Sequence, residues 1–154
     1  MRPLLLRCSL AGARHKATTA LRKQVVIVDD DAGVLAFLCD LFESAGFKQV
    51  ITYSDPLHAF REFVRTSCPD LIVTDYRMAR LTGVDLLNEL ALLYGKVNAI
   101  IITGDSALVR DASCAFPVLD KGIVGFGRNL LALAVNLLSP SAAKSYAVAD
   151  DMKR

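Results

Sequence analysis

Apolar and polar residues alternate in blocks along most of this chain. Five short runs rich in Val, Ile and Leu predict β-strands, at about residues 24–28, 49–53, 71–75, 97–103 and 117–120. After each run, apolar residues recur every three or four positions and predict a helix, at about residues 32–45, 56–67, 84–93, 107–113 and 125–138. Because strands and helices alternate, the pattern predicts one α/β domain with a parallel sheet.

Turn and capping residues support these boundaries. The run Gln24–Val28 is apolar after its first residue, so we expect a strand that is buried on both faces. Asp31 is expected to cap the following helix, and Gly46 to end it. The pair Asp55-Pro56 is expected to cap and open the second helix.

The order of the elements limits the topology. Right-handed crossovers place helices on both faces of a parallel sheet. We therefore expect a flavodoxin-like (βα)5 sandwich of three layers, with a parallel five-stranded sheet in the order 2-1-3-4-5. Four apolar side chains of the second helix are expected to face the core, namely Leu57, Phe60, Phe63 and Val64.

The composition is that of a compact domain, but the charge is unevenly distributed. Of the 154 residues, 53% are hydrophobic and 22% are charged, which allows a sizeable core. Residues 1–23 carry six basic residues and no acidic one, whereas the remainder carries 12 basic and 16 acidic residues. We therefore expect no nucleic-acid binding by the body of the protein. No run of about 18 apolar residues is present, so we expect no membrane span. Cys39 and Cys68 fall in helical patterns and are expected to be small apolar residues in a reducing compartment, which fits a cytoplasmic location.

Three segments are expected along the chain: a basic N-terminal tail at residues 1–23, a domain at residues 24–138 and a C-terminal tail at residues 139–154. For residues 1–23, three interpretations stay open, namely a disordered tail, an organellar transit peptide and a basic arm that contacts an acidic partner. The end of the C-terminal tail is polar and is expected to fray.

Polar residues follow four of the five predicted strands. Asp29 and Asp30 follow the first strand, Asp75 ends the third, Thr103 ends the fourth and Lys121 follows the fifth. The carboxyl ends of parallel strands meet at one edge of the sheet, where α/β proteins bind ligands. Two carboxylates about 4 Å apart repel by roughly 4 kcal/mol at an effective dielectric of 20. Such a cluster requires a cation or raised pKa values, and its hard oxygen ligands suit Mg²⁺.

Each of these residues also has an ordinary structural interpretation. The Asp29–Asp31 run has the composition of a turn and helix cap, and Asp75 alone has that of a strand-end turn. Thr103 is common in strands, and a lone Lys121 is most often a solvated surface charge. These ordinary interpretations explain the whole cluster only if every one of them holds at the same edge of the same sheet.

Four segments in order resemble the receiver domain of two-component response regulators. They are VVIVDDD at 25–31, DLIVTDYRM…TG at 70–83, IIITG at 100–104 and VLDK at 118–121. The resemblance covers about residues 23–138, and the four segments together are much more specific than any one alone. The resemblance implies that the chain is a CheY-like protein of a two-component phosphorelay.

The resemblance implies a role for each residue of the cluster. Asp75 corresponds to the phosphoacceptor, Thr103 to the hydroxyl that bonds a phosphoryl oxygen, and Lys121 to the cation that pairs with Asp75 and then with the phosphoryl group. Such chemistry relies on orientation and on positive charge near the transferred oxygens. Receivers catalyse their own phosphorylation and dephosphorylation, so the chain is not expected to be a conventional enzyme.

The resemblance also implies a Mg²⁺ site. Asp30 corresponds to the direct ligand, Asp29 assists it through water, and Asp75 and the backbone carbonyl of Arg77 complete the protein's share of the shell. Arg77 and Asp105 stand two residues after Asp75 and Thr103, where the family places side chains that tune rates. A salt bridge between them at the pocket mouth is a further hypothesis, against that of a surface pair of little energetic value.

Several positions depart from the family pattern. Ala79 and Gly122 stand where prolines are common, the latter in a cis Lys-Pro bond, and Val118 replaces an aromatic residue that reports activation. The segment between Thr103 and Lys121 is short by about one helical turn, which makes the fourth helix a stub. We expect these departures to leave phosphoryl acceptance intact and to make the signal output non-standard.

Three classes of function are weighed on this basis. The first is a phosphorylatable receiver, stand-alone or excised from a hybrid kinase, with a histidine kinase or histidine phosphotransfer protein and a downstream protein target as partners. The second is a receiver-like interaction module whose pocket no longer turns over. The third, a phosphatase of the haloacid-dehalogenase type, needs an acid two residues after the nucleophile, where this chain has Arg77. No GxxxxGK[ST] loop or CxxC pair is present, which argues against a nucleotide triphosphatase and a zinc site.

Overall fold

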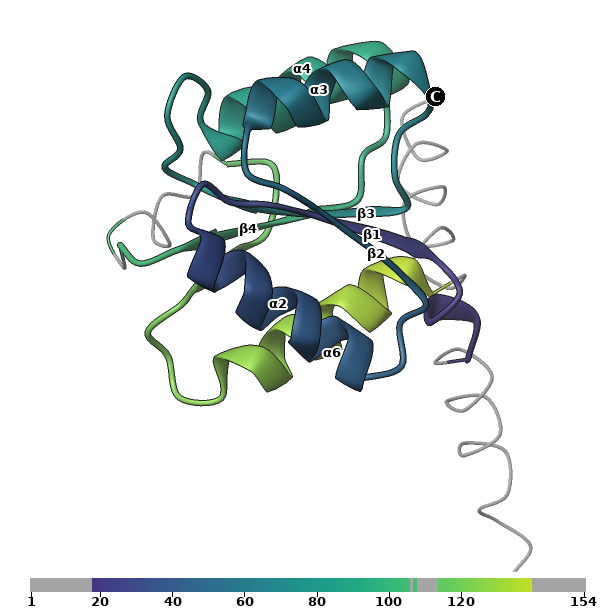
Figure 1. The fold of residues 1–154 in the computed structure, drawn as a ribbon, viewed down its shortest axis with the longest axis vertical. Helices are drawn as coiled ribbons and strands as arrows, with labels where there is room; N and C mark the ends of the chain where they lie inside the picture. Colours follow the sequence, from purple (N-terminus) through teal and green to yellow (C-terminus); the bar gives the residue numbers. More distant parts are fainter. Residues whose placement is uncertain (1–17, 106, 108–113, 140–154) are drawn as a thin grey trace, which may run out of the picture.

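The computed structural model describes residues 18–105, 107 and 114–139. A five-stranded sheet in the order β2-β1-β3-β4-β5 lies between two layers of helices, with α3 and α4 on one face and α2 and α6 on the other (Figure 1). All four neighbouring strand pairs are parallel. The predicted flavodoxin-like fold and strand order are confirmed.

The boundaries of the described elements lie within two residues of those expected from the sequence. The strands are β1 Gln24–Val28, β2 Gln49–Tyr53, β3 Leu71–Asp75, β4 Ala99–Thr103 and β5 Val118–Asp120. The helices of the described part are α2 Ala32–Ser44, α3 Pro56–Arg65, α4 Gly83–Tyr94 and α6 Phe126–Leu138. The short helix predicted at about residues 107–113 lies, apart from Ala107, outside the described residues.

Side-chain caps fix the starts of three helices. The Asp31 carboxylate accepts hydrogen bonds from the backbone N–H groups of Gly33 and Val34, and Asp55 caps α3 in the same way. Thr82 and Asp85 form a capping box at the start of α4. The predicted caps at Asp31 and Asp55 are therefore confirmed. Because each cap stands at the carboxyl edge of the sheet, it also fixes where the preceding loop leaves its strand.

The core lies on both sides of the three central strands. Strands β3 and β4 are buried at every position, and β1 at all but its first, as expected for strands covered on both faces. In α3 the buried residues are Pro56, Ala59 and Phe63, spaced for one helical face. The expectation that Val64 faces inward is wrong, since its side chain is 52% exposed. Successive residues of an α-helix are rotated by about 100° about the helix axis, so Val64 lies off the buried face and points to the solvent.

The packed part of the chain begins before β1. Ala20 is fully buried in the core beside α2 and α6, although residues 1–23 were expected to form a tail. Asp70, just before β3, accepts hydrogen bonds from the Lys23 ammonium and the Gln24 backbone N–H. These contacts join the start of β1 to that of β3. None of the helices that the structure describes is long and apolar enough to cross a bilayer.

Candidate functional site

The parallel register brings the predicted site residues to one edge of the sheet. Strand β1 pairs with β3 up to Val28 and Thr74, so the residues after them emerge side by side. Strand β4 lies on the other side of β3, and β5 beyond it. Asp29, Asp30, Asp75, Thr103 and Lys121 therefore all lie at the carboxyl edge, as the alternation of strands and helices predicted.

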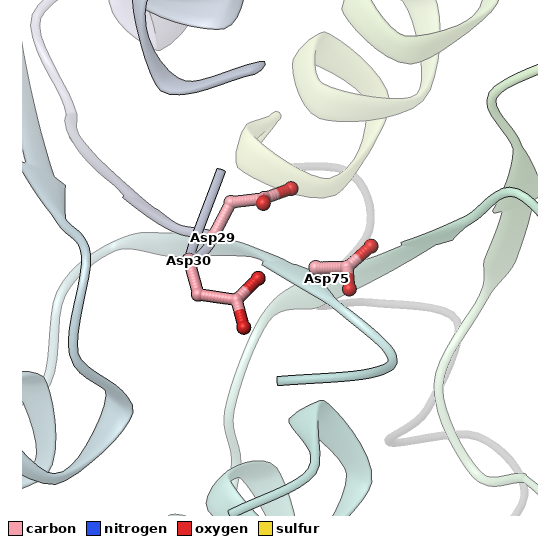
Figure 2. A group of neighbouring side chains, drawn as sticks. All are labelled: Asp29, Asp30 and Asp75. Carbon is pink, nitrogen blue, oxygen red and sulfur yellow. The ribbon is translucent and has the colours of Figure 1, made fainter. Parts of the chain in front are cut away.

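Three carboxylates form the centre of this edge. Figure 2 shows Asp29 and Asp30 at the end of β1 and Asp75 at the end of the neighbouring β3. One oxygen from each carboxylate lies within 4.8 Å of the others. Asp29 is 1% exposed and Asp75 is 8% exposed, whereas Asp30 faces solvent. The cluster thus has a buried side and an open side.

Lys121 is the counter-charge on the buried side. Its Nζ lies 2.6 Å from Asp75 Oδ1 and 3.0 Å from Asp29 Oδ2. Burial raises the pKa of Asp29 above its usual value, although its hydrogen bonds to the Asp31 N–H and Lys121 work in the opposite direction. Burial acts to lower the pKa of Lys121, but its hydrogen bonds to Asp75 and Asp29 outweigh it and raise that pKa. The lysine is therefore held as a cation between two carboxylates.

Backbone N–H groups orient all three carboxylates. Asp29 Oδ1 accepts from the Asp31 N–H at 2.9 Å, and Asp75 Oδ2 accepts from the Arg77 N–H at 2.9 Å. Asp30 Oδ2 accepts at 3.2 Å from the N–H of Ala79, which lies in the loop after β3. The loop between β3 and α4 consequently holds two of the three acids in place.

A second group of polar residues lies at the mouth of the site. The buried Thr103 hydroxyl accepts a hydrogen bond from the Asp105 N–H at 3.1 Å. The Asp105 carboxylate in turn lies 3.0 Å from the Arg77 guanidinium, so the salt bridge expected from the sequence is present. Both side chains are well exposed, at 40% and 71%, and such pairs contribute about 0–1 kcal/mol. The pair joins the loops after β3 and β4.

Gly83 has a role in the site that was not predicted from the sequence. It is buried at the start of α4, and its N–H donates to the Tyr76 carbonyl at 3.0 Å. A Cβ at this position would collide with the backbone carbonyl of Asp75. The close approach of α4 to the end of β3 therefore requires glycine at this position. The periodicity of apolar residues along the sequence does not reveal this requirement.

The loop after Lys121 differs from the family pattern in the way the sequence indicated. Gly122 donates its N–H to Asp120 Oδ1 at 2.7 Å, which forms a turn, and none of the described peptide bonds is cis. The Lys121 N–H donates to the Thr103 carbonyl at 2.8 Å and extends the β4–β5 pairing by one bond. This backbone bond positions the lysine without a proline.

The donor set fits a hard divalent cation. Three carboxylates with converging oxygens, one of them open to solvent, supply the ligand type that Mg²⁺ prefers and leave room for its water. Asp29, Asp30 and Asp75 would hold the ion. The backbone carbonyl of Arg77 stays a predicted fourth ligand.

Comparison with known sequences gives a consistent result. The sequence model of the response regulator receiver domain matches residues 25–126. A protein-glutamate methylesterase/protein-glutamine glutaminase of Hydrogenovibrio crunogenus is 36% identical over 104 residues, 67% of this chain and 27% of that protein. The transcriptional regulatory protein FixJ of Bradyrhizobium diazoefficiens is 29% identical over 137 residues, 83% of this chain and 63% of FixJ. The chain spans less than two thirds of the length of either relative.

Solved structures show the same fold. A response regulator receiver domain protein from Clostridium thermocellum has a TM-score of 0.65 at 26% identity, over 75% of this chain and 94% of its own. A chain of the CheX-CheY-BeF3-Mg²⁺ complex from Borrelia burgdorferi has a TM-score of 0.62 at 21% identity, over 75% of this chain and 88% of its own. At the latter identity the likeness concerns the fold alone.

Proposed function

Because this chain belongs to the response regulator receiver domain family, we propose that it accepts a phosphoryl group on Asp75 from a histidine kinase or a histidine phosphotransfer protein. The observation that carries the proposal is the arrangement around Asp75. Its carboxylate lies 2.6 Å from the Lys121 ammonium and within 4.8 Å of carboxylate oxygens of Asp29 and Asp30. The phosphorylated protein would then signal through contacts with a downstream protein.

The reaction is a transfer between two nucleophiles. The Asp75 carboxylate attacks the phosphorus of a phosphohistidine, an O–P bond forms as the P–N bond breaks, and the leaving imidazole takes a proton from solvent. An attacking carboxylate needs no base, so catalysis rests on position and charge. The Arg77 and Ala79 N–H groups hold two of the acids in orientation, as described above.

Lys121 and Thr103 have the donors that the transferred group requires. An ammonium has three N–H groups, so Lys121 can hold both carboxylates and still donate to a phosphoryl oxygen. The Thr103 hydroxyl accepts from the Asp105 N–H, and its own O–H can donate to another phosphoryl oxygen. Mg²⁺, when bound by Asp29, Asp30 and Asp75, supplies positive charge that offsets the anionic phosphoryl oxygens.

Asp75→Asn is expected to abolish phosphorylation. The wild-type protein, incubated with Mg²⁺ and acetyl phosphate, is expected to gain one phosphoryl group per chain by intact-mass spectrometry, because acetyl phosphate replaces the phosphohistidine donor. The asparagine variant lacks the nucleophilic oxygen and should show no adduct. Asp40→Asn, at an exposed site on α2, is the matched control and should label like the wild type. An adduct of equal size in Asp75→Asn would overturn the assignment.

A receiver-like interaction module without turnover is the second candidate. Gly122 in place of the usual proline and Val118 at the start of β5 favour it, since neither reproduces the family's switching residues. Mg²⁺ binding separates the two functions. A working site is expected to raise the melting temperature in millimolar Mg²⁺ over that in chelator, and Asp30→Asn should reduce this shift. An interaction module is expected to show no shift and no phosphoryl adduct.

A further inference from the structure

The outer face of the layer formed by α3 and α4 carries an apolar patch near the ends of both helices. Four of the eight large apolar side chains that are exposed in the described part of the chain lie there, with exposed fractions of 52%, 82%, 56% and 39% for Val64, Leu92, Leu93 and Tyr94. Leu92 stands nine residues, or two and a half turns, after the buried Gly83, so it points away from the sheet. A group of exposed apolar residues, unlike a single one, is typical of an interaction surface.

The two helices hold this α3–α4 patch together as one surface. Figure 1 shows α3 and α4 side by side on one face of the sheet. The Tyr94 hydroxyl donates a hydrogen bond to the Phe63 carbonyl at 2.7 Å and so joins the end of α4 to that of α3. Val64 follows Phe63 and Leu93 precedes Tyr94 in the chain, so the two helices contribute neighbouring parts of the patch.

The exposed charges beside the patch differ in sign between the two helices. Arg61 and Arg65 are exposed on α3, whereas Asp85 and Glu89 are exposed on α4. Arg65 lies 3.6 Å from Glu62 of its own helix, so Arg61 is the better placed of the two arginines for a charge on another molecule. A surface with opposite charges on its two halves is complementary to itself, because a two-fold axis brings α3 of each copy to α4 of the other.

Arg61 and Glu89 also lie at similar heights along the two helices. The hydrogen bond between Tyr94 and Phe63 marks the same height on α4 and α3. Arg61 precedes Phe63 by two residues and Glu89 precedes Tyr94 by five, which places them about 3 Å and about 8 Å before that height. The difference of about 5 Å is within the reach of an arginine and a glutamate side chain.

We propose that the α3–α4 patch is the interface of a homodimer in which α3 of each copy packs against α4 of the other. Arg61 of each copy then pairs with Glu89 of the second copy, and the two apolar patches face each other. The two-fold axis of this arrangement runs along the helices. An axis across the helices would instead place α3 on α3 and α4 on α4, where like charges would repel. The charges therefore select the first arrangement.

The size of the surface predicts a weak dimer. Helix α3 has 10 residues and α4 has 12, which makes them about 15 Å and about 18 Å long. Two such helices about 10 Å apart offer a face of about 300–400 Å². A stable complex buries about 800 Å² on each partner. We therefore expect a dimer that dissociates on dilution.

Sedimentation velocity of the full chain, from micromolar to submillimolar concentration, measures the association. The wild-type mass is expected to rise from that of a monomer towards that of a dimer. Leu92→Glu places a charge in the middle of the patch and should keep the protein monomeric at every concentration. Phe37→Glu, at an exposed apolar residue of α2 in the other layer, is the matched control and should associate like the wild type.

Exchange of the charges tests which helices meet. Arg61→Glu alone opposes two acidic groups at each contact, and Glu89→Arg alone opposes two basic groups, so each variant should associate about tenfold or more weakly. A mixture of these two variants restores opposite charges at both contacts and should form a heterodimer. The double variant Arg61→Glu/Glu89→Arg should associate like the wild type.

Four outcomes would overturn the proposal. A wild-type protein that stays monomeric would show that the patch does not bind a second copy, and a fall in melting temperature on Leu92→Glu would then assign the patch to another segment of the same chain. Association that survives Leu92→Glu would place the interface elsewhere. Single charge variants that associate like the wild type would exclude the pairing of Arg61 with Glu89. Circular dichroism checks that each variant is folded. Labelling by acetyl phosphate should be unchanged in Leu92→Glu, because the acidic cluster lies at the other end of α4.

Discussion

Gly83→Ala is expected to destabilise the protein by about 3 kcal/mol, the upper end of what overpacking a core costs. The added Cβ would overlap the backbone carbonyl of Asp75 and press on the Thr74 side chain. A flexible side chain can move away from a new methyl group, but the carbonyl at the end of a buried strand cannot. The free energy of unfolding in urea measures the effect.

Gly104→Ala is the matched control for this prediction. Gly104 also follows a strand at the carboxyl edge, but an added Cβ there would meet nothing within 4 Å. Its free energy of unfolding should change by no more than about 0.5 kcal/mol. If both variants were equally stable, α4 would not approach β3 as closely as the structure shows.

Gly83→Ala should also slow phosphorylation. Where Gly83→Ala remains folded, relief of the overlap requires the Asp75 carbonyl to shift, and the Asp75 carboxylate shifts with it. Phosphoryl transfer depends on orientation, and a displacement of about 1 Å can cost about 100-fold in rate. Single-turnover labelling with acetyl phosphate, well below the melting temperature, separates this loss from unfolding.

Regular features of the fold could be predicted from the sequence. Runs of β-branched residues and helical periodicity marked the strands and helices, and the alternation of the two fixed which ends of the strands meet. The meeting of Asp29, Asp30 and Asp75 then followed from topology rather than from any contact between neighbours in sequence. Local capping rules placed Asp31 and Asp55 for a similar reason, because each cap is a property of a few consecutive residues.

The features that the sequence did not reveal depend on single steric or packing events. Gly83 stands immediately before the helix expected at about residues 84–93, but its need for glycine comes from a carbonyl eight residues earlier. Val64 was assigned to the core because it is apolar, yet its angular position on α3 exposes it. Ala20 lies in a segment without a clear pattern and is nevertheless fully buried. Such contacts become visible only when the elements are placed in three dimensions.

Lys121→Met is expected to have the second large effect, because it removes the cation from two acids while keeping a similar side-chain length. Asp29 and Asp75 are almost fully buried and would face each other without a counter-charge. Breaking a buried pair costs about 3–5 kcal/mol, and we expect about 2–3 kcal/mol here because the lysine is 24% exposed. Lys48→Met, at an exposed site, is the matched control and should change stability little.

The loss of stability should depend on pH with a definite sign. The wild-type pairing requires ionised carboxylates, and in Lys121→Met their mutual repulsion is fully present at neutral pH. As the pH falls, Asp29, whose pKa burial already raises in the wild type, binds a proton, and the repulsion within the pair is lost. The difference in unfolding free energy between the two proteins should therefore shrink towards low pH. A difference that stays constant between neutral and acidic pH would contradict the electrostatic explanation.

Mg²⁺ provides a test of whether Lys121 acts in the proposed phosphoryl transfer as well as in stability. Without the ammonium, the three carboxylates attract a divalent cation more strongly, so the rise in melting temperature with Mg²⁺ should be larger in Lys121→Met than in the wild type. If Lys121 served only as a counter-charge for Asp29 and Asp75, Mg²⁺ would restore labelling together with stability. If the ammonium also donates to the transferred group, labelling should stay reduced by about 100-fold even when Mg²⁺ has restored the fold. Measuring the extent of labelling and the melting temperature on one sample of Lys121→Met, with Asp75→Asn as the unlabelled reference, decides between these two roles.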